Sequence, residues 1–487
     1  MEKTLAASGS YRFNRISFFL NGEDIAVELP PGISTLDFLN KMMHMYGSKC
    51  SCNEGDCGAC TVVVAQAREG AIVYEAINSC LYPAAKLHGK HLITIEGLGS
   101  PEALHPIQTA ILEHHGTQCG YCTPGFVMSL FALLASIANP DKAAILAALE
   151  GNLCRCTGYQ SILDAAMELS ALCPRAEIMP AFCQAIEPKL FYFDRPAEDC
   201  EKTDTPLHLI RRYHKARSSE EICRLLAEHP DAGLIAGGTD IMVQKNIGRR
   251  SFERLIDLSD IHELAQIQMK RDGIHIGSAV TYSQIMDSGI IKCDLPYLVE
   301  LCGLIASKQI RNFGTLVGNV ANASPVGDSL PLLLVLEARL VLLSQAGQRE
   351  LPITDFFLDY RKTALEAGEF IREIVIPIPP RDAYIKTMKS AKRKSVDIAS
   401  VVSAIRIQKD DTALLAFGGV AATPALSKDF PGLYQSGSSA EAIAEQVAGE
   451  FRPLSDVRGS SDYRRQMIKN HIIKYLELQD GKASLAY

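Results

Sequence analysis

Several features are missing from this chain of 487 residues, and each absence argues against a class of protein. No uninterrupted apolar run of about 18 residues is present, so we expect no membrane-spanning helix. The formal net charge is −7, so a general nucleic-acid-binding protein is not expected. The first residues contain no apolar run followed by a small-residue cleavage site. We therefore expect no secretory signal and a place in the reducing cytoplasm.

The sequence does contain fifteen cysteines, within an ordinary globular composition of 47% hydrophobic and 22% charged residues. Cytoplasmic thiols are kept reduced, so this number of cysteines favours metal or redox chemistry over disulfides. The chain is too long for a single hydrophobic core, and its length predicts about three domains.

The first group of cysteines lies in the stretch SKCSCNEGDCGAC and just beyond it. Cys52, Cys57 and Cys60 have the spacing C-x4-C-x2-C, and Cys80 follows in NSCLYP. This is the plant-type ferredoxin pattern for a [2Fe–2S] cluster. A zinc knuckle is the alternative, although zinc sites usually use paired C-x2-C units. Cys50 does not fit the spacing and is the alternative ligand in place of Cys52.

A second group of four cysteines lies in two loops between predicted helices. Cys119 and Cys122 form a C-x2-C unit, and Cys154 and Cys156 form a C-x-C unit farther along the chain. Both loops lie next to helix starts, where the positive end of the helix dipole favours thiolate and cluster charge. The four thiols predict a second four-cysteine metal site, for which a structural zinc is the alternative.

Two glycine-rich segments are candidates for contact with a ligand. In LIAGGTDI a strand runs into two glycines before a helix begins, which by itself predicts a turn, and phosphate binding by the exposed N–H groups is the alternative. The segment NFGTLVGNVANASPVGDSLP is almost free of charge, which suits backbone lying against a large flat ligand. Its Asp328 either caps the next helix or accepts a ribose hydroxyl. The residues of the first segment are Leu234, Ile235, Ala236, Gly237, Gly238, Thr239, Asp240 and Ile241.

The apolar pattern and the turn residues predict a multidomain α+β protein. A hairpin turns at Asn21 and Gly22, and a helix capped by Ser34 or Thr35 runs to Gly47. The larger segments are a four-helix unit over 104–172, a proline-containing linker over 173–206, an α/β region from 207 and an α+β region from 383.

The motifs GDCGACTV, QCGYCTPG and GNLCRCTGY resemble the iron–sulfur module of the molybdenum hydroxylases, the family of xanthine dehydrogenase and aldehyde oxidase. The resemblance covers residues 14–170 and implies one [2Fe–2S] cluster in each of two domains, the helical domain lying nearer the molybdenum. It also implies that Gln118 contacts the molybdopterin of the catalytic portion, an ordinary loop glutamine being the alternative.

LIAGGTDI and TLVGNVANASPVGD resemble the FAD domain of the same family, in which the first segment binds the flavin pyrophosphate and the second wraps the rest. FFLDYRKTAL and KSAKRKSVDIASV continue the resemblance. Family members often place an aromatic side chain near the flavin ring where this chain has Ile305. The basic run 392–394 is either a solvated face or attracts the phosphates of a nicotinamide nucleotide. By motif position, the resemblance implies FAD contacts for Thr315, Leu316, Val317, Gly318, Asn319, Asp328, Ile371 and Lys389.

The resemblance also implies the nature of each domain. We expect the chemistry to be carried by cofactors, because no residue set for substrate hydroxylation and no molybdopterin-binding region is found. The expected parts are a plant-type ferredoxin (β-grasp) domain over 14–98, a helical [2Fe–2S] domain over 99–173, a linker over 174–206, an α/β FAD-binding domain over 207–382 and an α+β C-terminal domain like that of the CO dehydrogenase flavoprotein over 383–487.

The domain order resembles the small subunit of the bacterial xanthine dehydrogenases within this family. It implies electron transfer from a molybdenum site on a large partner subunit through two clusters to FAD and then to NAD+, in a dimer of heterodimers. The reaction implied is xanthine, NAD+ and water giving urate and NADH. The alternatives are a subunit of an aldehyde or other N-heterocycle oxidoreductase, since substrate choice lies on the partner, and a non-catalytic ferredoxin–flavoprotein electron carrier.

Overall fold

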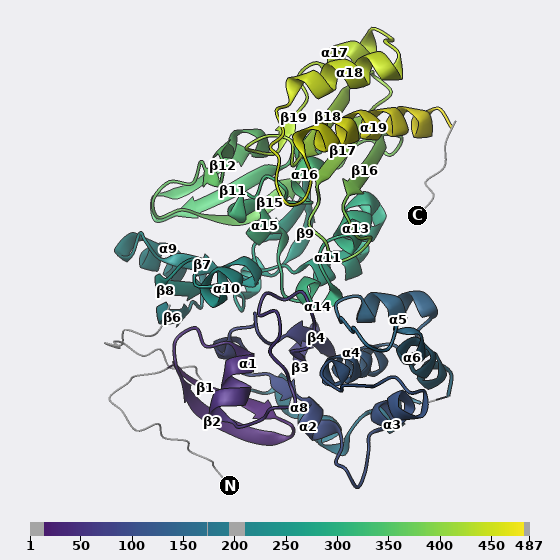
Figure 1. The fold of residues 1–487 in the computed structure, drawn as a ribbon. Helices are drawn as coiled ribbons and strands as arrows, with labels where there is room; N and C mark the ends of the chain where they lie inside the picture. The colour runs from purple at the N-terminus through teal and green to yellow at the C-terminus, as the bar shows by residue number, and fades with distance from the viewer. Residues whose placement is uncertain (1–13, 173, 194–209, 482–487) are drawn as a thin grey trace. The chain divides into compact units, whose positions relative to one another are not determined.

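The computed structural model describes residues 14–172, 174–193 and 210–481 (Figure 1). The chain divides into two compact units, each built from segments that are far apart in the sequence. The first unit comprises the chain up to Lys215 with Asp231–Asp257 and Ser307–Gly314, and the second comprises Ala216–Pro230, Leu258–Ala306 and the chain from Thr315 onward.

A five-stranded sheet begins the first unit, in the strand order β2-β1-β5-β3-β4. β1 and β2 form the predicted hairpin, and both turn residues, Asn21 and Gly22, have the positive φ angles that a tight two-residue turn requires. β5 runs parallel to β1, whereas β3 pairs antiparallel with β4 and β5. Val62 and Val63 point into different hydrophobic clusters, so the sheet is buried on both faces. The strands are β1 Asn14–Leu20, β2 Glu23–Leu29, β3 Thr61–Arg68, β4 Ala71–Asn78 and β5 His91–Ile93.

The helix predicted to run to Gly47 is shorter in the structure. Helix α1 (Thr35–Asp37) begins at the predicted cap, because the Ser34 hydroxyl accepts a hydrogen bond from the Asp37 amide at 3.1 Å. The helix continues only as a π-helical turn over Phe38–Met42. The Asn40 side-chain amide then donates to the Met45 and Ser48 carbonyls at 2.6 and 3.3 Å. These bonds stabilise an irregular loop where the prediction continued the helix over residues 43–47.

The predicted four-helix unit is present and follows a short helix, α2 (Ile95–Leu98). Pro124 lies in the first turn of α4, where its missing N–H would have no partner in any case. Every residue of α4 from Gly125 to Ala135 is buried, so α4 is the central helix of this bundle. The four helices are α3 Pro106–Glu113, α4 Thr123–Ser136, α5 Lys142–Leu149 and α6 Gln160–Leu172.

The segment predicted as a linker is partly helical, and the prediction is wrong for its described part. Two helices, α7 (Arg175–Ile178) and α8 (Ala181–Phe191), begin directly after Pro174 and Pro180. Proline is well tolerated at a helix start, so these prolines begin helices. Cys183, Ile186 and Leu190 recur at helical spacing and are buried in the core of the first unit. The remainder of the predicted linker, from residue 194, lies outside the described residues.

A three-stranded parallel sheet, in the order β6-β8-β7, completes the first unit. Its strands share a hydrophobic cluster with the N-terminal sheet, in which Tyr213 and Leu255 pack together with Phe18 and Leu92. Helix α10 follows β7, and helix α14 lies in the separate segment Ser307–Gly314. The bounds are β6 Ile210–Lys215, β7 Gly233–Ile235, β8 Phe252–Asp257, α10 Thr239–Asn246 and α14 Lys308–Arg311.

The second unit contains an antiparallel sheet in the order β12-β11-β15-β10-β9 and a small hairpin, β13-β14. Helix α16 is fully buried and packs into the cluster that also contains the central strands of this sheet. Strands β9 Ile267–Lys270, β10 Gly273–Gly277, β11 Arg339–Ser344, β12 Gly347–Pro352, β13 Phe357–Asp359, β14 Lys362–Thr363 and β15 Phe370–Ile376 accompany helices α9 Ser219–Glu228, α11 Tyr282–Asp287, α12 Gly289–Asp294, α13 Pro296–Gly303, α15 Leu316–Asn322 and α16 Leu330–Val335.

The C-terminal part of the second unit is an antiparallel sheet in the order β16-β17-β18-β19, followed by three helices. Ile468, Ile472 and Tyr475 of the last helix are buried against the sheet. The elements are β16 Tyr384–Ser390, β17 Val401–Ile407, β18 Ala413–Gly418, β19 Ala425–Leu426, α17 Phe430–Gln435, α18 Ala440–Glu450 and α19 Ser461–Gln479.

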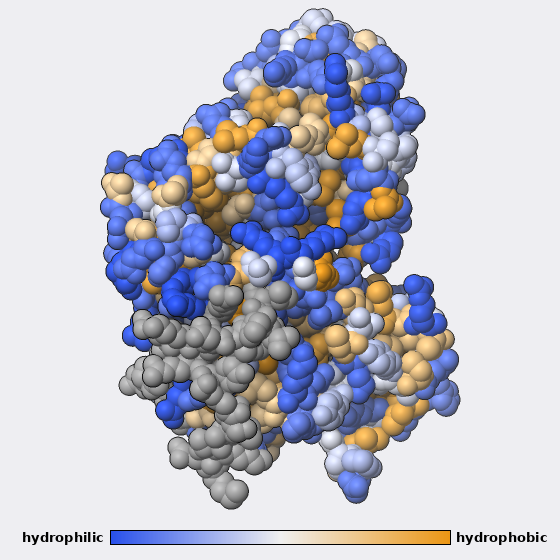
Figure 2. All heavy atoms as spheres, turned by 60° about the vertical axis from the view of Figure 1, so that its left-hand side comes forward, coloured by the Kyte–Doolittle hydropathy of each residue, from blue (hydrophilic) through white to orange (hydrophobic). Residues whose placement is uncertain are grey.

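The predicted multidomain α+β fold is confirmed by these sheets and helices. On the face seen in Figure 2, apolar side chains lie in small groups between hydrophilic ones. Among the helices of the described residues, none combines the length and the apolar character needed to cross a bilayer.

Candidate cofactor sites

The register of one hairpin brings Cys60 and Cys80 together. β3 and β4 pair so that Thr61 lies opposite Asn78, and the two cysteines lie just beyond these ends. Their Sγ atoms are 3.3 Å apart, and both side chains are buried. The Asn78 side-chain amide also lies 3.9 Å from the Cys60 sulfur, as a donor toward it.

Cys52 and Cys57 form the second pair of this loop. Their side chains hydrogen-bond to each other, and the Glu54 amide donates to the Cys52 sulfur at 3.4 Å. Hydrogen bonds from the Cys57 side chain and from backbone N–H groups, that of Glu54 among them, lower the pKa of Cys52 to about 5, although burial acts in the opposite direction. Cys50 is exposed and lies outside the pair, which favours Cys52 as the ligand.

The second group of cysteines is also arranged in pairs. The Sγ atoms of Cys119 and Cys156 are 3.8 Å apart, and Cys122, at the start of α4, hydrogen-bonds to Cys154. The Cys154 sulfur accepts from the Cys156 amide at 3.4 Å and lies 3.2 Å from the Thr157 hydroxyl. Burial raises the pKa of Cys154, but the bonds from Thr157 and from backbone amides outweigh it and lower this pKa to about 7.

Each cysteine group therefore offers two thiol pairs. Two sulfurs bound tetrahedrally to one metal at about 2.3 Å lie about 3.8 Å apart, close to the spacings of the Cys60–Cys80 and Cys119–Cys156 pairs. A [2Fe–2S] cluster needs four thiolates, two on each iron, and the two thiol pairs of each group supply this donor set. Within the described part of the chain, no group of three or more His, Cys, Asp or Glu is gathered as a single ion would require.

The two cysteine loops contact each other directly. The Leu153 amide donates to the Cys57 carbonyl at 2.9 Å, and the Tyr121 hydroxyl donates to the Cys50 carbonyl at 2.5 Å. Gly58 has a φ of +66°, and a Cβ there would overlap the carbonyl oxygen of Gly151. A glycine is therefore required for the first loop to lie against the second.

The segment LIAGGTDI lies in the first unit and has the predicted strand–turn–helix form. β7 ends at Ile235, and Gly238, with a φ of +85°, begins helix α10. A Cβ on Gly237 would overlap the Phe313 carbonyl, so the turn is packed closely against Ser307–Gly314. The backbone amides at the start of a helix are groups that can bind a phosphate, so phosphate binding at this turn stays a prediction.

Two side chains, buried Lys86 and half-buried Asn246, connect this turn and its helix to the ferredoxin fold. The Lys86 ammonium donates to the Ala236 carbonyl and lies 3.7 Å from the Asp257 carboxylate. Asn246, at the end of α10, donates to the Cys80 carbonyl at 2.9 Å and to the Asn53 carbonyl at 3.1 Å. The helix that follows the predicted phosphate turn is thus bonded to the backbone of a predicted cluster ligand.

The second predicted flavin segment lies in the second unit. The Thr315 hydroxyl accepts from the Gly318 amide at 3.0 Å and begins helix α15. Asn319 accepts a hydrogen bond from the Ser329 hydroxyl at 2.7 Å. Ile305, Leu316, Val317 and Ile371 are buried in one hydrophobic cluster. The structure therefore gathers the apolar residues of this predicted site.

Asp328 does not cap the following helix, which excludes one of its two interpretations. Helix α16 begins at Ser329 without any side-chain cap, and the Asp328 Oδ2 atom accepts from the Lys389 ammonium at 2.7 Å. The Lys389 ammonium also donates to the Leu304 carbonyl at 2.8 Å. Burial raises the pKa of Asp328, while Lys389 opposes this shift. The Asp328 Oδ1 atom is buried without a hydrogen-bond partner, which fits a site that receives a donor such as a ribose hydroxyl.

The remaining predicted residues are Gln118 and the basic run 392–394. Gln118 is exposed in the loop before Cys119. In the basic run, the Lys392 ammonium donates to the Val457 carbonyl at 2.8 Å, and the Arg393 guanidinium donates to the Val396 carbonyl at 2.7 Å. These contacts agree with a solvated face.

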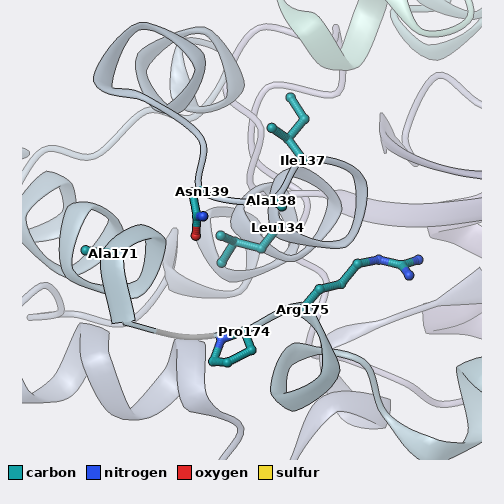
Figure 3. A pocket seen from close by; sticks show the side chains of 7 residues that line it. All are labelled: Leu134, Ile137, Ala138, Asn139, Ala171, Pro174 and Arg175. Carbon is teal, nitrogen blue, oxygen red and sulfur yellow. The ribbon is translucent and has the colours of Figure 1, made fainter.

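A surface cavity of about 360 Å³ lies in the helical domain, away from every predicted site residue. Figure 3 shows Leu134 and Asn139 turned toward the cavity and the Arg175 side chain extending away from it. The Arg175 guanidinium donates to the Ala135 carbonyl at 2.7 Å. The cavity therefore adds nothing to the cofactor sites.

Sequence reasoning missed the side chains that support these sites. Lys86, Asn152, Asn246 and Gln309 all bond to backbone or side chains more than ninety positions away in the sequence. Asn152 lies within the GNLCRC motif, so its position in that motif could have indicated a role near the cluster. The other three have no local pattern that distinguishes them from ordinary polar residues.

Four sequence families match successive parts of the chain. Residues 18–84 match a "2Fe-2S iron-sulfur cluster binding domain" and residues 94–167 a "[2Fe-2S] binding domain". Residues 207–379 match the "FAD binding domain in molybdopterin dehydrogenase", and residues 386–478 the "CO dehydrogenase flavoprotein C-terminal domain". These matches confirm the expectation of FAD and two [2Fe–2S] clusters.

Similar whole proteins include a xanthine dehydrogenase of Blastobotrys adeninivorans and a xanthine dehydrogenase/oxidase of Mus musculus, each 30% identical. The alignments cover 98% and 95% of this chain but only 42% and 39% of the two relatives. The chain therefore spans about two fifths of the length of these relatives.

Among solved structures, a chain of carbon monoxide dehydrogenase from Hydrogenophaga pseudoflava is similar, with a TM-score of 0.53 and 27% identity. A chain of quinoline 2-oxidoreductase from Pseudomonas putida 86 is similar with a TM-score of 0.52 and 27% identity. The matches cover 56% and 55% of this chain and 98% and 97% of those chains.

Proposed function

The chain belongs to the molybdenum hydroxylase family as its iron–sulfur and FAD portion, and on this premise we propose that it connects a molybdenum site on a partner subunit to NAD+. The proposed overall reaction is the oxidation of xanthine to urate with reduction of NAD+. The relatives named xanthine dehydrogenase support this choice.

The observation that carries the proposal is the direct contact between the two cysteine loops. The Leu153 amide precedes the ligand Cys154 and donates to the carbonyl of Cys57, itself a ligand in the other loop. A second contact, from Asn246 to the Cys80 carbonyl, leads from the first loop to the helix that follows the phosphate turn. Backbone and hydrogen bonds therefore join all three candidate sites of the first unit.

The residues proposed to hold the cofactors are those described above. We propose Cys52, Cys57, Cys60 and Cys80 as ligands of one cluster. When bound, the clusters supply one-electron transfer and FAD supplies exchange of an electron pair with the nicotinamide. The second cluster has Cys119, Cys122, Cys154 and Cys156 as ligands, the phosphate turn has residues 234–241, and the FAD contacts of the second unit are Ile305, residues 315–319, Asp328, Ile371 and Lys389.

The partner belongs to the same proposal. A large molybdopterin-binding subunit would supply the substrate site, Gln118 would contact its pterin, and two heterodimers would associate in the cytoplasm. The exposed position of Gln118 beside Cys119 is compatible with such a contact. The four domains expected from the sequence, over 14–98, 99–173, 207–382 and 383–487, are proposed unchanged, whereas the described part of the segment 174–206 is helical and is not proposed as a linker.

A second candidate substrate is supported by the structural relatives. A chain of quinoline 2-oxidoreductase shares the fold, so oxidation of another N-heterocycle, or of an aldehyde, by the partner is the alternative. Because substrate choice lies on the partner, isolating the complex and assaying xanthine against quinoline and an aldehyde decides between these candidates.

The NAD+ assignment is tested on the purified chain under anaerobic conditions. NADH is added while the visible absorption of the flavin and of the iron–sulfur clusters is recorded. Bleaching of both sets of bands supports the proposal, because electrons must enter at the flavin and reach the clusters. Unchanged bands in a protein that dithionite reduces fully would contradict NAD+ as the acceptor and favour oxygen or a protein acceptor.

A further inference from the structure

A buried network of side chains lies where the two cysteine loops meet. The Gln309 Nε2 atom donates to the Asn152 Oδ1 atom at 2.9 Å and to the Ser129 hydroxyl at 3.0 Å. The Ser129 hydroxyl also donates to Asn152 Oδ1 at 2.7 Å. From Asn152 the Nδ2 atom donates to the Gly58 carbonyl at 3.2 Å and approaches the Thr61 hydroxyl at 3.4 Å.

These side chains come from three separate parts of the first unit. Gly58 and Thr61 adjoin the ligands Cys57 and Cys60, and Asn152 lies two residues before Cys154. Gln309 lies on α14, in the segment Ser307–Gly314, whose neighbours in the sequence belong to the second unit. The network therefore ties both cluster loops to a segment of the FAD-binding part of the chain.

The network is almost completely shielded from water, so breaking its hydrogen bonds is costly in free energy. Gln309 is 0% exposed, Asn152 and Ser129 are 2% exposed, and Thr61 is 1% exposed. A buried amide that loses its hydrogen-bond partner cannot bond to water instead, so a network of this kind holds its members in one arrangement.

Two further residues of the same segment also bind it to the iron–sulfur domains. The Arg311 guanidinium forms a 2.5 Å ion pair with Glu150, beside the second cysteine loop. The Asn312 side-chain amide donates to the Ala76 carbonyl of β4 at 2.7 Å. Three successive polar contacts, from Gln309, Arg311 and Asn312, thus bind one short segment to both iron–sulfur domains.

We propose that Gln309 and Asn152 are positioning residues that fix the separation and orientation of the two iron–sulfur clusters. Neither residue is expected to bind iron, because the eight assigned cysteines already supply the four ligands that each of the two clusters needs. They act through the loops that carry the ligands, since outer-shell contacts commonly set the geometry of a metal site. The inference rests on the cysteine assignment of the proposed function.

The test uses two nearly isosteric variants that remove the polar groups, Gln309→Met and Asn152→Leu, in the full chain. Ser403→Ala is the matched control, because Ser403 belongs to a buried network in the second unit, 2.8 Å from His471 and from the Tyr475 hydroxyl. Iron content is measured first. The dithionite-reduced proteins are then compared by electron paramagnetic resonance for the spin–spin splitting between the two clusters, which depends on their distance and orientation.

The expected result is unchanged iron content with a decreased or lost splitting in both network variants, and the wild-type splitting in Ser403→Ala. Ser129→Ala, which removes only one hydroxyl, should show a smaller decrease. Wild-type splitting in Gln309→Met overturns the inference. Loss of iron in all three network variants also overturns it, because the residues would then be needed to assemble the clusters. Failure of the cysteine assignment would instead appear as missing cluster signals in the unaltered protein.

Discussion

At the scale of single residues, the close approach of the two cysteine loops depends on glycine at position 58. We predict that Gly58→Ala loses most of its bound iron, because the new Cβ would overlap the Gly151 carbonyl and push the loops apart. Iron and acid-labile sulfide analysis measures this loss. Gly70→Ala is the matched control, since Gly70 also has a positive φ, +81°, but faces open space. Both variants carry a strain of about 1 kcal/mol. Equal iron contents in the two variants would contradict the prediction.

A second residue-scale prediction concerns acid stability. Burial lowers the pKa of His471 to about 4, and its ring nitrogens lie 2.8 Å from the Ser403 and Ser390 hydroxyls. An unfolded histidine has a pKa of about 6.5, so the unfolded state binds more protons between about pH 6.5 and 4. The stability contributed by neutral His471 is therefore complete above about pH 6.5 and is lost as the pH falls toward 4, by up to about 1.4 kcal/mol per pH unit.

The measurement is the urea concentration at the midpoint of unfolding, at pH values between 7.5 and 4.5. Unfolding is monitored with a spectroscopic probe placed in the second unit. His471→Gln should show a shallower loss of stability with falling pH than the unaltered chain, because its side chain does not titrate. Parallel curves for the two proteins would show that His471 is not responsible. His91 in the first unit has its pKa lowered to about 4 by burial as well and stays present in both proteins.

At the scale of elements, the short helix α15 depends on its cap. Thr315→Val removes the hydroxyl that accepts from the Gly318 amide, so it should lower the free energy of unfolding by about 1 kcal/mol and weaken FAD retention. Thr315→Ser keeps the hydroxyl and serves as the control. Thermal unfolding and flavin content after gel filtration measure the two effects. A valine variant with the stability and flavin content of the serine variant would contradict the role of the cap.

Elements also show where sequence patterns were sufficient and where they failed. The C-x4-C-x2-C spacing and the Thr123-Pro124 helix start act within a few residues, so both could be read locally. The prolines of the expected linker gave a wrong prediction, because Pro174 and Pro180 stand at helix starts and α8 buries a face at Cys183, Ile186 and Leu190. The helix after Ser34 ends early through the side-chain bonds of Asn40, which no periodicity reveals.

At the scale of the whole molecule, the domain order could be predicted because each domain carries its own motif. The supporting contacts could not, since they join residues that are distant in the sequence. Gln309 bonds to Asn152, 157 positions earlier, and Asn246 bonds to Cys80, 166 positions earlier. Such pairs depend on tertiary packing, and a single sequence gives no signal for them.

The most direct test of the account is an anaerobic reductive titration of the purified chain with dithionite, after its iron, sulfide and flavin have been quantified. One electron for each of the two clusters and a pair for FAD predict an uptake of about four electrons per chain. Two distinct cluster signals should appear in the paramagnetic resonance spectrum. An uptake of about two electrons, or zinc in place of iron at either cysteine group, would contradict a single chain that carries two iron–sulfur clusters and a flavin.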